Sequence, residues 1–213
     1  MRNIISLNSG WSFTKEGKTE VVALPHTWNA VDGSDGGNDY YRGTCVYERT
    51  LTAADIPEGD LVYLEIPAAN ASAEVFYNDV SLASHDGGYS LFRAKLGSAS
   101  VGDQIRILVD NSANDRVYPQ MADFTFYGGL YRGAALIGVN GSHFDLMDHG
   151  SSGLYVTPFL EEGKARITLQ GVVSASDEAL ENLKVCYTIL SQEGEKISSV
   201  TVPAEQNAEI SLD

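Results

Sequence analysis

The sequence predicts an all-β fold, in which a jelly-roll β-sandwich is followed by a partial immunoglobulin-like β-sandwich. Two observations predict the strands: apolar and polar residues alternate with a period of two, and turn residues separate these short runs. A third is composition, because 21 glycines and 11 tyrosines in 213 residues favour a loop-rich, strand-rich chain. No convincing helical periodicity occurs in the first 140 residues.

The first predicted domain, residues 1–140, contains eight short strands, as expected for a sandwich of the jelly-roll type. Asn78-Asp79 lies between two of them and predicts a hairpin turn, because both residues tolerate positive φ. The predicted strands cover residues 11–15, 20–24, 44–51, 61–67, 73–78, 89–96, 104–111 and 134–140.

Two long stretches interrupt this strand pattern, at residues 26–39 and 112–129. Unstructured loops of that length inside a compact domain usually carry function. Each runs into a cluster of Tyr, Gly and Arg, "YYRG" at 40–43 and "YGGLYRG" at 127–133. We therefore expect the two loops to meet at one end of the sandwich.

The second predicted domain, residues 141–213, has three or four strands, with residues 191–195 as a hairpin loop. Residues 176–183 form either one helical turn, capped by Ser176 or Asp177, or a loop. An immunoglobulin-like domain has about seven strands, so we expect this one to be shortened at its C-terminus.

Composition and charge exclude several functions. The net charge of −15 disfavours binding to nucleic acid or to an anionic membrane and is compatible with neutral ligands. No signal peptide and no run of 18 apolar residues occurs, so the default location is cytoplasmic. Cys45 and Cys186 lie 141 positions apart, and no disulfide is expected between them.

No catalytic or metal motif stands out. The four histidines are scattered, without zinc spacing, and no nucleophile elbow, phosphate loop or dinucleotide fingerprint occurs. The segment "DGSDGGND" offers oxygen ligands for a hard cation, but its spacing differs from that of the calcium loop. A hydrated glycine-rich turn explains the segment more simply, and no cofactor is expected. Its oxygen-bearing residues are Asp32, Asp35, Asn38 and Asp39.

The segment "DFTFYGGLYR", residues 123–132, combines a carboxylate, four aromatic residues, two glycines and an arginine. Aromatic faces beside a carboxylate suit sugar recognition, because rings stack on the C–H faces of a sugar and charged acceptors bind its hydroxyls. Alternatively, aromatic residues here alternate into a core and Arg132 pairs with a nearby acid, which would account for about half of the aromatics. That alternative would bury Phe124, Phe126 and Tyr131; it explains neither Asp123 nor Gly128-Gly129.

Six motifs in order resemble the N-terminal region of glycoside hydrolase family 2, the β-galactosidase and β-glucuronidase family. The resemblance covers nearly the whole chain, and six ordered motifs are far more specific than one. They are "LNSGWSF", "LPHTWNA", "DGGNDYYRGTCVYER", "HDGGYSLF", "DFTFYGGLYRGAAL" and "HFDLMDHGSSGLYVTP".

The resemblance implies a sugar-binding jelly-roll domain, then an immunoglobulin-like domain, then a TIM barrel with the two catalytic glutamates of a retaining β-glycosidase. This sequence contains no such barrel, so the resemblance implies a non-catalytic N-terminal fragment of an enzyme of the β-galactosidase type. The implied partners are a β-glycoside substrate in the parent active site and the chain's own C-terminal barrel. A homo-oligomer is left open, and any cation would be held mainly by the barrel.

By the same resemblance, Asp123 is the acid that reaches over the barrel and contacts the sugar in the catalytic subsite. Asn38, Asp39 and Arg42 border the active site as weaker candidates, and Tyr127 joins them as a substrate-binding residue. Some positions depart from the family pattern: Gly133 stands where Asp is usual, Asp79 where the turn has Gly, and Cys45 often where Gly occurs.

Two other functions stay open. The chain is alternatively a self-sufficient carbohydrate-binding module, which would bind glycans without a barrel, or a purely structural sandwich, which would bind none. Whether the sugar is a galactoside, a glucuronide or a mannoside is also open.

Overall fold

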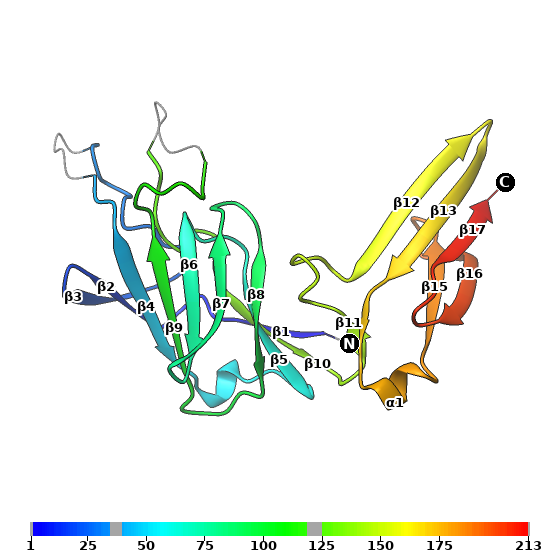
Figure 1. Cartoon of the computed structure of the whole chain (residues 1–213), viewed down its shortest axis with the longest axis horizontal. Helices are drawn as coiled ribbons and strands as arrows, with labels where there is room; N and C mark the ends of the chain where they lie inside the picture. Colours follow the sequence, from blue (N-terminus) through cyan, green and yellow to red (C-terminus); the bar gives the residue numbers. More distant parts are fainter. Residues whose placement is uncertain (1, 35–39, 119–124, 213) are drawn as a thin grey trace. The chain divides into compact units, whose positions relative to one another are not determined.

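The computed structural model describes residues 2–34, 40–118 and 125–212. It confirms the predicted all-β class, with β-sandwich architecture and, among the described residues, a single short α-helix, α1 (Asp177–Leu180), and one 3-10 turn, η1 (Ala53–Asp55) (Figure 1). The chain divides into two compact units, residues 1–139 and 140–213.

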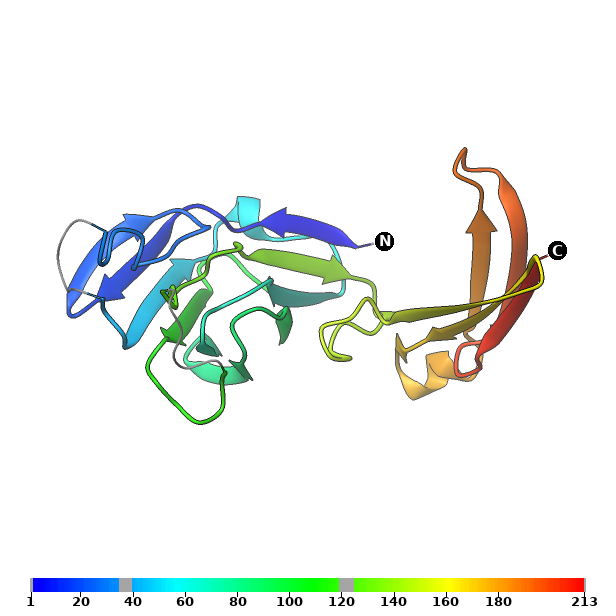
Figure 2. The ribbon, with the colours of Figure 1, turned by 90° about the horizontal axis from the view of Figure 1, so that it is seen from above.

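The first unit is a sandwich of two antiparallel sheets (Figures 1 and 2). One sheet has four strands in the order β1 (Asn3–Ser6), β10 (Ala135–Val139), β5 (Leu61–Ile66) and β8 (Phe92–Gly97). The other has six, in the order β3 (Lys18–Val22), β2 (Trp11–Lys15), β4 (Thr44–Thr50), β9 (Gln104–Asp110), β6 (Ser72–Tyr77) and β7 (Val80–Asp86).

The core of this unit follows from strand alternation. In β9, Ile105, Ile107 and Val109 are buried while the residues between them are only half-buried. Because successive side chains point to opposite faces of a strand, this pattern places one face of each sheet in the core. The largest fully buried side chains in this core include those of Trp11, Tyr47, Leu64, Ile66, Ile107 and Leu136.

The described residues of the first unit form ten strands where the sequence predicts eight, because β1 and β7 were not predicted. The strand predicted at 20–24 begins instead at Lys18, since Glu16 and Gly17 adopt positive φ (49° and 76°) and turn the chain directly after Lys15. The turn predicted at Asn78-Asp79 is confirmed, with φ of 47° and 64°.

Within residues 140–212, the second unit has seven strands where three or four were predicted. They form a three-stranded sheet, β12 (Leu154–Glu161), β13 (Lys164–Gly171) and β17 (Ala208–Leu212), and two strand pairs, β15 (Lys184–Leu190) with β16 (Lys196–Pro203) and β11 (His143–Phe144) with β14 (Val173–Ser174). Ser176 caps α1 by accepting a hydrogen bond from the Ala179 N–H, so the helical alternative for 176–183 is confirmed.

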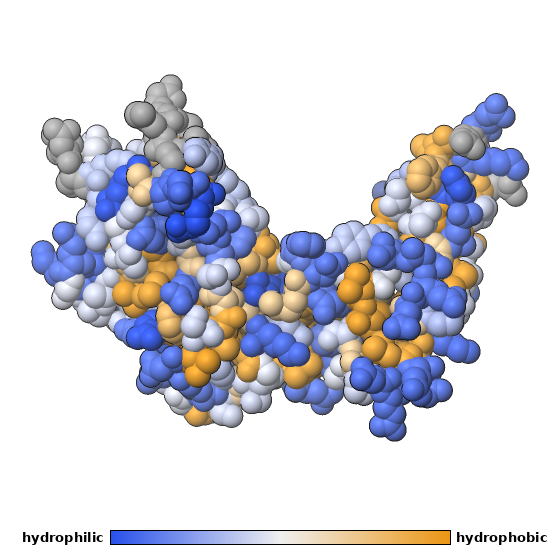
Figure 3. Space-filling model, in the orientation of Figure 1, coloured by the Kyte–Doolittle hydropathy of each residue, from blue (hydrophilic) through white to orange (hydrophobic). Residues whose placement is uncertain are grey.

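The core of the second unit is small. Its buried members are Leu169, Val185, Tyr187, Ala204, Ala208 and Ile210. Strand β12, in contrast, leaves large apolar side chains exposed, and Figure 3 shows hydrophobic surface on this unit. Both cysteines are free, Cys45 buried in the first unit and Cys186 exposed in the second. No described helix has the length and hydrophobicity needed to cross a membrane.

Candidate functional site: a rim formed by two loops

The two long loops of the first unit are joined where they return to the sheets. The Tyr40 hydroxyl donates a hydrogen bond to the Phe126 carbonyl (2.9 Å) and accepts one from the Phe126 N–H (2.6 Å). The segments that lead into the loops leave the sandwich at the same end (Figure 1). The predicted meeting of the loops is therefore confirmed for the described residues.

A buried pair of asparagine side chains links the segments of the two loops by hydrogen bonds. Asn29 and Asn111 are completely buried, and the Asn111 Nδ2 donates to the Asn29 Oδ1 (3.1 Å). Asn29 Oδ1 also accepts from the Gly128 N–H (2.7 Å), and its Nδ2 donates to the Tyr41 carbonyl (2.8 Å). Asn111 accepts from the Gly43 N–H (2.9 Å).

These bonds satisfy backbone groups of two separate segments, those of Tyr41 and Gly43 and that of Gly128, and a buried group left without a partner would cost about 1–3 kcal/mol. The 26–32 segment, the start of β4 and the 126–129 segment are thereby fixed relative to one another. This support holds the side chains where the two loops meet. We call this surface, formed by Tyr40, Arg42, Phe126 and Tyr127, the rim.

Two glycines let the loop backbone approach this support. A Cβ on Gly128 would lie 2.0 Å from the Trp28 ring, which excludes any side chain there. Gly129 has φ of 128°, and a Cβ there would lie 2.5 Å from the His26 carbonyl oxygen. Close packing as well as conformational freedom thus explains why glycine occupies both positions.

Arg42 lies on this rim. Its Nε donates to the Asn111 carbonyl (2.7 Å), and its guanidinium lies 5.9 Å from the Tyr40 ring centroid and 5.6 Å from that of Phe126. Contact of a guanidinium with two aromatic rings fixes its orientation. Tyr127 is also at the rim: its side chain is 45% exposed, and its carbonyl accepts from Asn70 Nδ2 (2.8 Å).

The hollow that the described residues form beside Arg42 is too small for a ligand. Its volume is about 10 Å³, and its lining includes Asn70, Asn111 and Phe126 together with Tyr89 and Tyr118. Space of that size holds roughly one water molecule. Tyr89 and Tyr118 are 60% and 74% exposed, so this end of the unit presents aromatic side chains outward. The described residues therefore form an open surface with aromatic side chains here, without enclosing a ligand-sized space.

The alternative that the aromatics of 123–132 simply enter the core is wrong for Phe126 and Tyr131. Both side chains are half-buried among the loops rather than between the sheets, and the Tyr131 hydroxyl donates a hydrogen bond to the Gly88 carbonyl. Arg132 makes no ion pair among the described residues and donates instead to the Tyr89 carbonyl (3.1 Å). The expected acid partner of Arg132 is thus replaced by a backbone oxygen.

The chemistry available from the described rim residues is that of a cation beside aromatic rings. Burial raises the pKa of Tyr40, despite its hydrogen bond with the Phe126 backbone and the nearby Arg42 charge. Burial likewise raises the pKa of Tyr131. Both hydroxyls therefore keep their protons at neutral pH, and they donate them to the Phe126 and Gly88 carbonyls. A guanidinium beside aromatic faces suits a ligand that is rich in hydroxyl or carboxylate oxygens.

Several predicted residues lie outside the described residues, namely Asp35, Asn38, Asp39, Asp123 and Phe124. Asp32 is described, and it serves the loop itself. Its Oδ2 accepts from Asn29 Nδ2 (2.6 Å) and from the Tyr41 N–H (3.0 Å). No group of three metal-binding side chains occurs in the described part of the chain.

Sequence reasoning missed the residues that support the rim, Asn29, Asn111, Tyr40 and Asn70. One of them carries a usable signal. Asn111 continues the inward positions of β9 after Ile105, Ile107 and Val109, so an amide falls where an apolar core residue is expected. Asn29 carries no such signal, because Asn is also common in turns.

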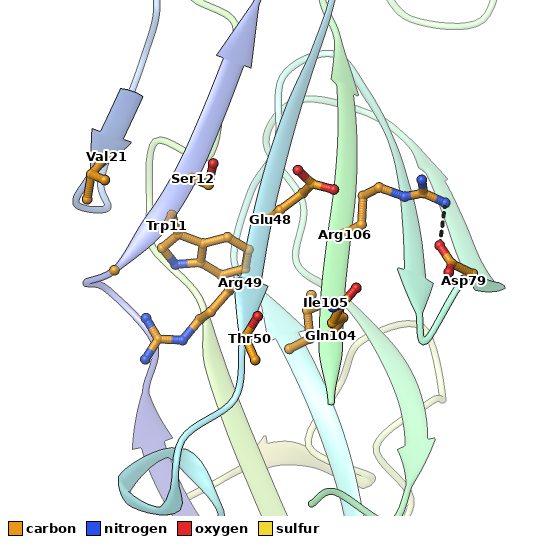
Figure 4. Close-up of a pocket in the computed structure, with 11 residues that line it drawn as sticks. Trp11, Ser12, Val21, Glu48, Arg49, Thr50, Asp79, Gln104, Ile105 and Arg106 are labelled. Atoms are coloured by element: carbon orange, nitrogen blue, oxygen red, sulfur yellow. Dashed lines mark ion pairs between the residues drawn. The ribbon is translucent and has the colours of Figure 1, made fainter. Parts of the chain in front are cut away.

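A larger hollow, of about 480 Å³, lies elsewhere on the first unit, beside strands β2, β4 and β9 (Figure 4). Ser12, Glu48 and Thr50 line it, and Arg106 at its border pairs with Asp79 (3.3 Å). None of the predicted site residues contributes to it. Size alone therefore does not mark the candidate site in this molecule.

No protein-family model matches the chain. A β-glucuronidase of Bacteroides fragilis is 34% identical over 162 residues, which are 73% of this chain and 23% of that protein. A β-galactosidase of Bacteroides ovatus is 27% identical over 202 residues, 88% of this chain and 22% of that protein. The chain thus spans about a quarter of the length of the curated relatives it matches.

A solved structure shows the same similarity. The crystal structure of an FMN-binding β-glucuronidase from Faecalibacterium prausnitzii superposes with a TM-score of 0.88 at 40% identity, over 100% of this chain and 34% of that one. The similarity therefore extends through both units described above.

Proposed function

Because the chain corresponds in sequence and fold to the N-terminal region of the family 2 glycoside hydrolases, we propose that it supports the catalytic domain of a β-glycosidase and lends a sugar-contacting rim to its active site. Catalysis itself is assigned to a TIM barrel with two carboxylates in the same polypeptide. The 213-residue chain is non-catalytic in this proposal.

One observation carries the proposal. The rim is rigidly supported, by the buried Asn29–Asn111 pair, and yet its described residues enclose a hollow of only about 10 Å³ beside Arg42. A preorganised wall without a pocket is what a site needs when a second domain supplies the remaining walls. A self-sufficient binding module would instead need a ligand-sized groove formed by the rim residues themselves.

Within this site we assign the principal sugar contact to Asp123, as an acceptor for sugar hydroxyls. Arg42 and Tyr127 contribute a cation and an aromatic face, and Asn38 and Asp39 complete the border. Interactions made away from the cleaved bond orient the substrate and lower the barrier only when they are stronger in the transition state. These residues are therefore substrate-positioning, and none of them is assigned to proton transfer.

The proposed substrate is a β-glycoside of galactose or glucuronic acid. The two relatives above 30% identity named here are β-glucuronidases, so a glucuronide is the first to be tested. The B. ovatus relative is a β-galactosidase, so a galactoside is tested beside it.

The test is the substitution Asp123→Ala in the polypeptide that carries this chain together with its barrel. Charged hydrogen bonds contribute about 1.5–3 kcal/mol, so kcat/KM should fall about 10- to 150-fold, since each 1.36 kcal/mol is tenfold. The thermal midpoint should stay unchanged. Asp115→Ala is the matched control, because Asp115 is an exposed acid in the same loop.

A variant that melts earlier but keeps normal kinetics would assign Asp123 a structural role and overturn this part of the proposal. The 213-residue chain alone should hydrolyse no nitrophenyl β-galactoside or β-glucuronide. It should also bind galactose more weakly than millimolar, which corresponds to about 4 kcal/mol. Micromolar binding by the chain alone would favour the carbohydrate-binding module.

A further inference from the structure

A second cleft of the first unit, of about 380 Å³, lies between the β2–β3 hairpin and residues 26–31. Its lining includes Phe13, Lys15, Lys18, Glu20, His26 and Trp28, and neither of the rim residues Arg42 and Phe126. The function proposed above makes no use of this cleft.

Two lysines face each other at this cleft. Lys15 and Lys18 are direct cross-strand partners in the β2–β3 pair, so their side chains share one face. Like charges in that position destabilise a strand pair. Lys15 Nζ lies 4.9 Å from the Tyr41 ring centroid, and among the described residues neither lysine forms an ion pair. A pair of cations is unexpected in a chain of net charge −15.

The floor of the cleft is aromatic and fixed. The Phe13 and Trp28 rings are stacked, with centroids 6.1 Å apart and an interplanar angle of 17°, and the His26 ring packs edge-on against Phe13 at 4.6 Å. His26 Nδ1 is held by the buried Tyr47 hydroxyl at 2.7 Å. Val31, which is 61% exposed, adds an apolar wall.

Among the described residues that line the cleft, Glu20 is the one carboxylate, and it limits the charge of a ligand. Glu20 is the cross-strand partner of Phe13, so it lies on the same face as the two lysines. One acid against two cations leaves a net charge of about +1 at the mouth, which suits a monoanion better than a polyanion.

We propose that this cleft binds a small ring compound with one carboxylate, whose charge is held by Lys15 and Lys18 and whose ring lies against the aromatic floor. Carboxylates form charge-assisted hydrogen bonds with ammonium groups, and flat C–H or aromatic faces pack on rings. A sugar acid and an aromatic carboxylic acid share this chemistry. The proposal stands independently of the rim and of any catalytic domain.

The test is an NMR titration of the 213-residue chain with glucuronate, benzoate and neutral galactose. The chain has two tryptophans, so two indole N–H signals report separately. The Trp28 indole, which lines the cleft and donates to the Tyr41 carbonyl at 3.4 Å, should shift. The Trp11 indole, fully buried and bonded to the Leu7 carbonyl, should not move and serves as the internal control.

The expected result is a saturable shift with glucuronate, benzoate or both, and none with galactose. A response to one acid alone identifies which of the two sources fits. Lys18→Gln should weaken binding roughly tenfold, because it removes one charged hydrogen bond, whereas Lys95→Gln, on the exposed face of β8, should have no effect.

Three outcomes would overturn the proposal. They are equal shifts with galactose, unchanged binding in a Lys15→Gln/Lys18→Gln double variant that keeps the wild-type Trp11 signal, and no shift of Trp28 with either acid. Binding that is lost in Arg42→Gln but kept in the double variant would place the ligand at the rim and would also overturn it. Because no barrel is present in this experiment, its failure leaves the proposed glycosidase function untouched.

Discussion

The two units bury their apolar strands to different extents. In the first, the inward faces of a six-stranded and a four-stranded sheet cover each other, and Trp11, Tyr47 and Ile107 are fully buried between them. In the second, β12 lies at the edge of a three-stranded sheet that is opposed by a strand pair. Its Val156 and Leu160 share a face with Leu169 and Ala165 of β13, yet they are 54% and 81% exposed.

This difference teaches that a strand's inward face is buried only as far as the opposing sheet reaches. A proline in β12 protects the open edge of this strand against pairing with a further strand. Val172 donates to the Gly153 carbonyl, so in this antiparallel register Pro158 turns its nitrogen toward the open edge. A proline in that position offers no donor to a further strand.

The sharpest test of the comparison uses the one cysteine in each unit. Burial raises the pKa of Cys45 to about 12, with the nearby Lys15 opposing, whereas hydrogen bonds from the hydroxyls of Thr201 and Thr188 lower the pKa of the exposed Cys186. At pH 8 the thiolate fractions should differ by more than about a thousandfold. A disulfide reagent should therefore modify one thiol of the native chain rapidly, as read from the absorbance of the released thiol.

The second thiol should react only when the first unit unfolds in denaturant. Cys186→Ser should abolish the fast phase, and Cys45→Ala should leave it unchanged. Two fast equivalents in the native chain would show that the first unit opens as readily as the second and would break the comparison.

Core truncation should separate the units next. Ile107→Ala removes a fully buried side chain from the first unit and should cost about 2–5 kcal/mol of unfolding free energy. Leu160→Ser, in the exposed part of β12, should stay within about 0.5 kcal/mol. Urea unfolding followed by tryptophan fluorescence suits the first measurement, because both tryptophans belong to the first unit, and circular dichroism covers the second. A large loss in Leu160→Ser would mean that β12 is covered in solution.

Most strands of the first unit could be predicted because their alternation is clear. β9, for example, spans 104–110 against a predicted 104–111, and the Asn78-Asp79 turn has the expected backbone. β12 could not be predicted, because "LYVTPFL" is apolar at nearly every position and contains a proline, so it shows no period of two. An edge strand exposed on both faces gives no alternation to recognise.

The candidate site was predictable in its location and not in its support. Long loops ending in Tyr, Gly and Arg pointed to the place where Tyr40 and Phe126 meet. The Asn29–Asn111 contact joins residues 82 positions apart, and only the fold brings such side chains together. Asp123, as the principal sugar contact, stays a prediction.

The smallest expected effect concerns acid sensitivity of the first unit. Burial lowers the pKa of His26 below its ordinary value near 6.5, with the charge of Glu20 opposing, and burial also lowers the pKa of His85. As the pH falls below about 6.5, the unfolded chain takes up protons at these histidines that the folded chain does not. The stability that is present above this pH is therefore lost as the pH falls through the folded-state pKa values.

The urea midpoint read by tryptophan fluorescence should accordingly decrease between about pH 7.5 and pH 5. The carboxyls whose pKa values are lowered in this unit, such as Asp110, held by Thr44 and Ser112 against its own burial, contribute only at lower pH, since they too lose stability as they become protonated. Above pH 5, the change in stability with pH therefore reports on the histidines of this unit. His26→Gln should flatten the pH dependence, because an amide keeps a partner for the Tyr47 hydroxyl without titrating. A midpoint that rises on acidification, or an unchanged slope in His26→Gln, would show that the His26 ring is accessible to water in the folded unit, and that the first unit is less tightly closed around it than its packing against Phe13 indicates.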